Sequence, residues 1–285
     1  MPSEKDVDPF PQFSSQVLEY CARSKIAFVR DAREALSLFL NLDIKVKNSY
    51  GWRFSSAEVI GEKLKEAKSV GELNRILWTD FVRNVEAYSV MTYWRCAEIL
   101  KSSVRSINTQ EYVSAAILAR SFIELSATYL WNANVALKAV ERLEFKRGIV
   151  VTSEELENYF VKAIWGTRLG SPEEHLLQKN VLTTIQKLSK NPAASDLLPT
   201  YEYLCEIAHP NVVGNARFWS HVEKVYEDGS ELRVMGRPTL ANESLPTLDK
   251  TIWAIAWGGA VSYNSFGMFR DATSMLLTKI ESGCG

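Results

Sequence analysis

Residues 201–211, YEYLCEIAHPN, hold the side chains best suited to acid–base chemistry in this 285-residue chain. Pro210 disfavours helical backbone at His209, so we expect a helix to end there. The negative end of the helix dipole would favour the protonated imidazole, and Glu206 lies three residues earlier, within side-chain reach. His209 is therefore either a general acid or base steered by Glu206, or a histidine that caps the last carbonyls of its helix.

Arg120 and Glu124 stand four residues apart within a very apolar segment, 115–130. A charge pair in such surroundings needs partners, because burial of an unpaired charge is costly. One interpretation places the pair in a polar pocket between helices, opposite His209, with Tyr203 lining the same pocket. The other makes it an ion pair along its own helix, or two charges that reach the surface.

Arg168 and His175 form a second pair of basic residues, with six residues between them in TRLGSPEEH. This spacing is similar to that of RNases of the HEPN superfamily, in which an Arg and a His at a helix converge on the RNA backbone. The resemblance implies that the arginine steadies the phosphate while the histidine acts on the 2′-hydroxyl or the leaving oxygen. Gly170 and Pro172 interrupt a continuous helix, so a surface arginine and a histidine at a helix start are the alternative.

The composition of the chain and the motifs that it lacks argue against several other classes of protein function. Lys plus Arg number 33 and Asp plus Glu 34, so the chain is not a strongly basic nucleic-acid binder overall. The four cysteines are scattered without a Cys-x-x-Cys motif, and no phosphate-binding loop, dinucleotide fingerprint or His-Glu-x-x-His motif is present. We therefore expect no metal and no cofactor.

We expect a cytoplasmic protein, because the sequence shows no signal peptide and its cysteines are scattered. The start, MPSEKDVDPF, lacks the apolar run of a signal peptide, and scattered cysteines suit a reducing compartment. Residues 251–269 carry no charge but include three glycines, so they favour a buried core helix over a membrane span.

The elements that must position these residues are mostly helices. Periodicity predicts helices at about 15–42, 70–106, 110–145, 195–209 and 244–280. Capping boxes begin at Ser55, Ser69 and Thr152. Aromatic and β-branched residues at 216–226 and 231–235 flank Asp228-Gly229, which predicts a hairpin.

These elements predict an all-α fold, a multi-helix bundle with one small β-hairpin insertion near 216–235. We expect a single domain, 1–285. Alternatively, an N-terminal helical subdomain, 1–108, precedes a second part, 109–281.

The order of the pieces over about 108–235 resembles uncharacterised bacterial proteins grouped as HEPN-like. These pieces are the helix with Arg120 and Glu124, the Gly-Thr-Arg turn at 166–168, NVLTTIQK at 180–187, and YLCEIAHPN at 203–211 followed by a hairpin. The resemblance implies a helical bundle for 109–281. Some HEPN relatives are toxins, phage-defence effectors or RNases.

Three functions follow as hypotheses. The first is binding of a protein partner, a second copy or a ligand, in bacterial stress or phage defence. The second is a metal-independent endoribonuclease acting on RNA through His209 or His175, with Arg168 or Arg120 on the phosphate. The third is a small-ligand sensor with an interhelical pocket. An RNase requires a basic open cleft, a sensor a closed apolar pocket, and a partner-binding protein a large exposed apolar patch.

Overall fold

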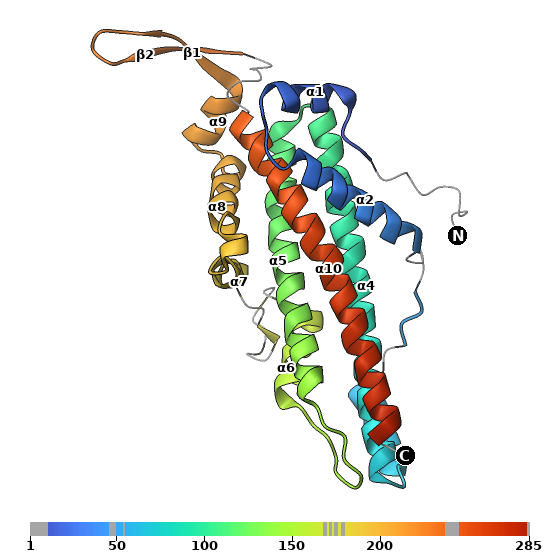
Figure 1. The fold of residues 1–285 in the computed structure, drawn as a ribbon. Coiled ribbons are helices and arrows are strands. Elements are labelled where there is room, and N and C mark those ends of the chain that lie inside the picture. Colours follow the sequence, from blue (N-terminus) through green and yellow to red (C-terminus); the bar gives the residue numbers. More distant parts are fainter. Residues whose placement is uncertain are drawn as a thin grey trace. The chain divides into compact units, whose positions relative to one another are not determined.

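The structure is a computed structural model, and it shows a bundle of α-helices with one two-stranded antiparallel hairpin (Figure 1). The predicted all-α fold with a small hairpin is thereby confirmed. The structure describes residues 11–45, 50–53, 55–167, 170, 173, 176–177, 180–236 and 245–283.

The elements follow one another along the chain as helices with a late pair of strands. They are α1 (Ser15–Arg23), α2 (Val29–Lys45), α3 (Ala57–Glu66), α4 (Val70–Asn108), α5 (Tyr112–Arg142), α6 (Glu154–Trp165), α7 (Val181–Leu188), the 3-10 turn η2 (Pro192–Ala194), α8 (Leu197–Ala208), α9 (Val212–Trp219), β1 (Ser220–Val225), β2 (Glu231–Met235) and α10 (Leu245–Gly283).

Three long helices, α4, α5 and α10, each contribute to two compact units. Unit 1 is drawn from Met1–Lys45, Cys96–Ala127 and Ile185–Val261, and unit 2 from Val46–Arg95, Thr128–Thr184 and Ser262–Gly285. The expected single domain, with its alternative division at 108/109, stays a prediction.

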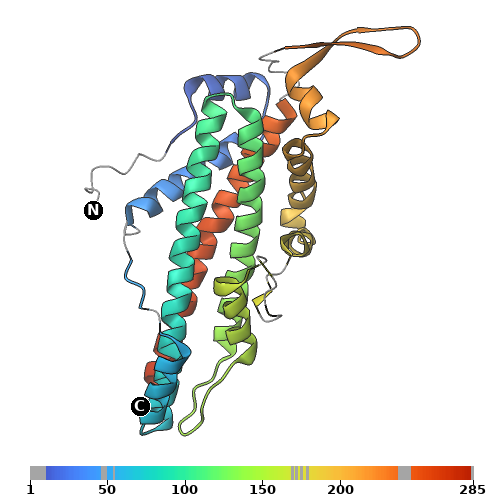
Figure 2. The ribbon, with the colours of Figure 1, turned by 180° about the vertical axis from the view of Figure 1, so that it is seen from behind.

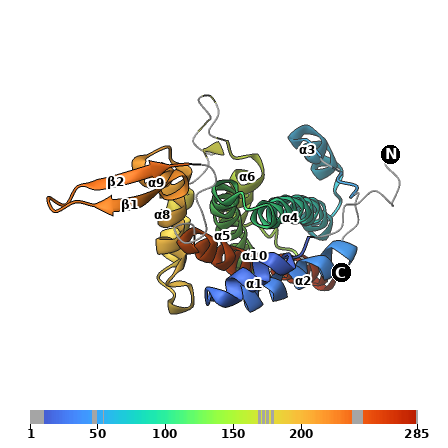
Figure 3. The same cartoon turned by 90° about the horizontal axis from the view of Figure 1, so that it is seen from above.

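The core of unit 1 is built around the first half of α10. A Cβ atom at Gly258 would stand 2.7 Å from Cε1 of Phe122, and one at Gly259 would stand 2.7 Å from Cβ of Ala35. The two glycines therefore let α10 approach α5 on one side and α2 on another, an arrangement visible from above in Figure 3. The uncharged stretch 251–269 is the core helix that the sequence predicted, since residues such as Ile252 and Phe269 are buried.

Polar contacts join the ends of the helices in unit 2, beside a buried apolar core that includes Leu156 and Phe160. The indole of Trp78 donates to the carbonyl of Val151 at 3.0 Å, which fixes the connection between α5 and α6 beside α4 (Figure 2). Lys279 Nζ donates to three carbonyls at the end of α5, those of Val140, Glu141 and Leu143. This lysine satisfies acceptors that a helix C-terminus leaves without a backbone partner.

The predicted single helix over 15–42 is wrong, because the chain breaks between α1 and α2. The amide of Ile26 donates to the carbonyl of Cys21 at 3.0 Å, and the amide of Lys25 donates to the carbonyl of Ala22 at 3.3 Å. These two bonds make a Schellman turn, in which Lys25 adopts a left-handed φ of 53°. The same turn ends α4, with Gln110 at φ 61°. Glycine usually occupies this position, and its absence at Lys25 hides the end of α1 in the sequence. The end of α4 lies within two residues of its predicted boundary at about 106.

Two of the three predicted helix caps lie one residue further on. Ser56 caps α3 by accepting from the amide of Val59, and Ser153 caps α6 by accepting from Leu156. Ser69 is confirmed at α4, where its hydroxyl accepts from the amide of Glu72 at 3.2 Å.

The hairpin is shorter than predicted at its start, because residues 216–219 belong to α9. Asn211 accepts the amide of Gly214 at 2.7 Å and so caps this helix. The turn is as predicted, with Gly229 at φ 81° between β1 and β2.

Among the described residues, one helix is long and apolar enough by length and composition to cross a membrane. It is α5, and 44% of its most apolar window is buried within the structure.

We predict opposite effects for two alanine substitutions on α10. Gly258→Ala should lower the free energy of unfolding by about 1–3 kcal/mol, because the new methyl group meets the fully buried Phe122 ring. Gly267→Ala has open space and should raise it by up to ~1 kcal/mol, because alanine favours helix. Urea unfolding of both variants measures the difference, and effects of equal sign and size would contradict the packing described.

Candidate functional site

A charged cluster joins α5 to α8 within unit 1. Arg120 Nη2 lies 3.2 Å from Glu124 Oε1, and the hydroxyl of Tyr201 donates to the same oxygen at 2.7 Å. The guanidinium carbon of Arg120 stands 5.8 Å from the centre of the Tyr201 ring. The Arg120–Glu124 pair is therefore an ion pair along its helix, with a tyrosine from a second helix as its partner.

Burial raises the pKa of the Tyr201 phenol, and its hydrogen bond to Glu124 raises the pKa further. The phenol therefore stays protonated at neutral pH and acts as a donor to the carboxylate. The side chains of Arg120 and Glu124 are 32% and 30% exposed, so solvent reaches both. One atom of the cluster, Nε of Arg120, is buried and has no hydrogen-bond partner among the described residues.

His209 follows α8, where the sequence placed it. Its amide bonds the carbonyl of Cys205 at 3.1 Å and its side chain is exposed. Glu206 accepts from the side-chain amide of Asn211 at 2.9 Å. Among the described residues, no hydrogen bond or ion pair joins the His209 imidazole to Glu206 or to Arg120. Glu206 thus holds the turn into α9.

Tyr203 lies on another face of α8 from Tyr201, because two residues along a helix turn by about 200°. Its hydroxyl lies 3.0 Å from Oγ1 of Thr247 on α10. The two tyrosines therefore tie α8 to α5 and to α10. A ligand site near Arg120 and Tyr203 stays a prediction.

Arg168 and His175 lie outside the described residues, so their pairing stays a prediction. In the part of the chain that the structure describes, no group of three or more His, Cys, Asp or Glu side chains is placed to hold a metal ion.

Tyr201 is the member of the cluster that sequence reasoning missed. It lies three and four residues before Leu204 and Cys205, which is the spacing of one helix face. That spacing could have placed Tyr201 toward a neighbouring helix, but it could not say which helix.

The hairpin, residues 220–235, is the second feature of unit 1 that stands out. Its apolar side chains are exposed on both strands, with Val225 62% and Met235 83% exposed. Leu232, Val234 and Tyr226 are exposed as well. Figure 1 shows the hairpin extending away from α8 and α9. A two-stranded hairpin alone is marginally stable in water, and exposed apolar side chains add nothing to its stability.

Pairing within the hairpin is regular along β2 and irregular along β1. Ser220 pairs with Met235 and Val225 with Glu231, and a register shift between Val222 and Lys224 leaves Glu223 as an extra residue. Such a bulge bends its own strand and blunts its free edge. The outer edge of β2 is therefore the better edge for another strand.

Comparison with protein-family models, with curated proteins and with solved structures gives no match. Membership of a HEPN-like family stays a prediction.

We predict that Tyr201→Phe lowers the free energy of unfolding by about 1–2 kcal/mol, because it removes a donor to a half-buried carboxylate. Tyr203→Phe is the matched control on the same helix. It removes a bond between two neutral hydroxyls and should cost about 0.5–1 kcal/mol. Chemical unfolding of both variants measures the two losses of free energy. A larger loss for Tyr203→Phe would contradict the prediction that the Tyr201–Glu124 bond stabilises α8 more than the Tyr203–Thr247 bond does.

Proposed function

We propose that this protein acts by binding a partner protein through its hairpin. The observation that carries the proposal is the exposure of apolar side chains on both strands, which reaches 83% at Met235. Exposed apolar surface of this kind is typical of sites that another protein covers. The resemblance to HEPN-like proteins supports a setting in bacterial stress or phage defence.

The charge of the hairpin favours a particular partner. It carries four acidic residues, Glu223, Glu227, Asp228 and Glu231, against two basic ones, Lys224 and Arg233. A surface with this balance repels phosphates, so it disfavours RNA and anionic lipid. The partner that fits is a protein with an extended apolar segment flanked by basic side chains.

Strand addition gives that partner a defined way to dock. The sheet has two strands, so the outer edge of β2 offers backbone donors and acceptors that no strand of the described chain pairs with. A partner segment added there gains main-chain hydrogen bonds, and its alternate side chains meet Leu232 and Val234. Specificity would then come from the acidic residues at the turn.

The RNase hypothesis has less support. Among the described residues, Arg120 pairs with Glu124 and Tyr201, and Glu206 bonds Asn211. An acid–base site needs an arginine and a histidine that converge on one phosphate. The pair that could still meet this need, Arg168 and His175, is outside the described residues.

In-cell photo-crosslinking tests the proposal. We predict that a benzophenone amino acid at position 235 gives one discrete adduct in the native host. The same amino acid in place of Met91, which is 42% exposed on α4, should give none. Leu232→Asp should abolish the adduct while changing the free energy of unfolding by no more than about 0.5 kcal/mol, because the side chain is exposed.

Three outcomes would overturn it. An adduct of twice the mass of the chain would mean that the hairpin binds a second copy. Equal adducts at both positions, or none at position 235, would mean that the hairpin has no specific partner.

A further inference from the structure

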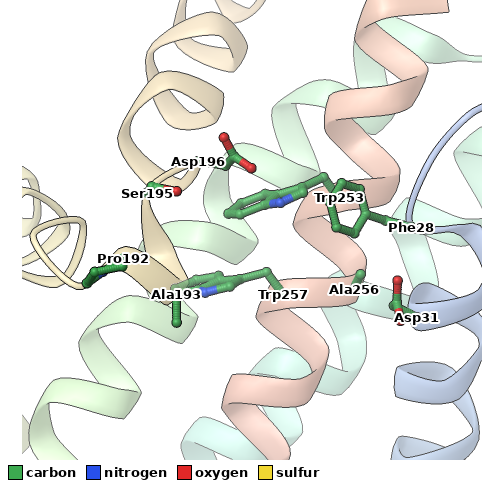
Figure 4. A pocket seen from close by; sticks show the side chains of 9 residues that line it. All are labelled: Phe28, Asp31, Pro192, Ala193, Ser195, Asp196, Trp253, Ala256 and Trp257. Carbon is green, nitrogen blue, oxygen red and sulfur yellow. The ribbon is translucent and has the colours of Figure 1, made fainter.

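Unit 1 contains an open pocket of about 410 Å³ that the hairpin does not touch (Figure 4). Its lining comes from the start of α2, from the turn before α8 and from the first half of α10. The lining residues are Phe28, Asp31, Pro192, Ala193, Ser195, Asp196, Trp253, Ala256 and Trp257. Its volume falls within the range of about 300–1,000 Å³ that is typical of small-molecule sites.

Two indoles form one wall of the pocket. Trp253 and Trp257 stand four residues apart on α10, so both project from the same face of the helix. Their ring centres are 5.8 Å apart and the rings are nearly parallel, at 6°. The face of an indole carries negative charge density and attracts cations, more strongly than the face of any other side chain.

Two carboxylates complete the set of charges. Of the described residues that line the pocket, Asp31 and Asp196 are acidic and none is basic. Figure 4 shows the two carboxylates on either side of the indole pair. Nη2 of Arg30 lies 3.9 Å from Oδ1 of Asp31, but the Arg30 side chain is 86% exposed, so water competes for that contact.

Asp196 is the residue immediately before α8, and its side chain makes no capping hydrogen bond. An aspartate at this position normally bonds a backbone amide of the first turn. The dipoles of α2 and α8 favour negative charge at both helix starts, which accounts for two acids there. The helix dipoles do not explain why both acids lie beside the faces of two indole rings.

Phe28 adds an independent sign of a binding site. Its φ is 61°, in the left-handed region that a bulky residue rarely adopts. This conformation carries a free-energy cost, yet the Phe28 side chain is not buried in return, because the residue is 42% exposed. The strained backbone instead leaves a third aromatic ring on the lining of the pocket.

We propose that this pocket binds an organic cation with an alkylated ammonium group. Its methyl groups would lie against Trp253 and Trp257, and Asp31 and Asp196 would balance its charge. A neutral ligand of the same shape lacks the attraction to the indole faces and the carboxylates, so it binds more weakly.

Fluorine NMR of the full chain labelled with 5-fluorotryptophan tests the proposal, with choline as the probe. Trp253→Phe and Trp257→Phe assign the two pocket resonances among those of the eight tryptophans. Choline should shift these two resonances in a saturable manner. The neutral isostere 3,3-dimethylbutan-1-ol should bind at least about tenfold more weakly.

Charge-removing variants separate a binding site from a nonspecific effect. Asp31→Asn and Asp196→Asn should each weaken choline binding several-fold, and both acids are accessible enough to be replaced without unfolding. Asp271→Asn, an exposed acid on α10 outside the pocket, is the matched control and should leave binding unchanged. No shift with choline, equal binding of the neutral alcohol, or equal loss in the Asp271→Asn control would each overturn the proposal.

Discussion

The close approach of α10 to two other helices is the constraint on which unit 1 depends. Gly258 brings its backbone against the ring of Phe122 on α5, and Gly259 brings it against Ala35 on α2. Any side chain at either position would move a neighbour that is fully buried. Because α2 and α10 both line the pocket, this contact also fixes the spacing between Asp31 and the two indoles.

Helix α8 packs on that core through the buried side chains of Leu197, Leu204 and Ile207, and two of its tyrosines add polar contacts. Tyr201 reaches Glu124 on α5, and Tyr203 reaches Thr247 on α10. The partly exposed Arg120–Glu124 ion pair alone would contribute only about 0–1 kcal/mol, whereas a hydrogen bond to a charged group contributes about 1.5–3 kcal/mol. Glu124 and Tyr201 thus contribute to the attachment of α8, and α8 in turn leads into α9 and the hairpin.

The sequence predicted most helices because their apolar residues recur at the helical period, as in 195–209 and 244–280. It also predicted the hairpin turn, because an Asp-Gly pair between two strand-like segments is typical of a tight hairpin turn. It missed the stop at Lys25, because the left-handed position there holds a residue that usually continues a helix. It missed α9 because Phe218 and Trp219, which favour strands, lie in a helix that Asn211 caps.

The candidate site was predicted less well than the fold. The Arg120–Glu124 pair was visible because four-residue spacing on a helix is a local property. Its third member, Tyr201, is 77 residues away from Glu124 in the chain, and the pocket also joins three segments that lie far apart in sequence. Local spacing carries no information on such contacts, so only the structure could bring these residues together.

Hydrogen exchange in the hairpin tests most directly whether its outer edge serves a partner protein. Amides of residues 220–235 would be followed in the purified chain at low and high concentration, and again after incubation with an extract of the native host cells. We predict rapid exchange of the β2 outer-edge amides in the purified chain at both concentrations, and slow exchange once the extract is added. Protection that rises with the concentration of the chain alone, or no protection with the extract, would contradict a heterologous partner at the hairpin.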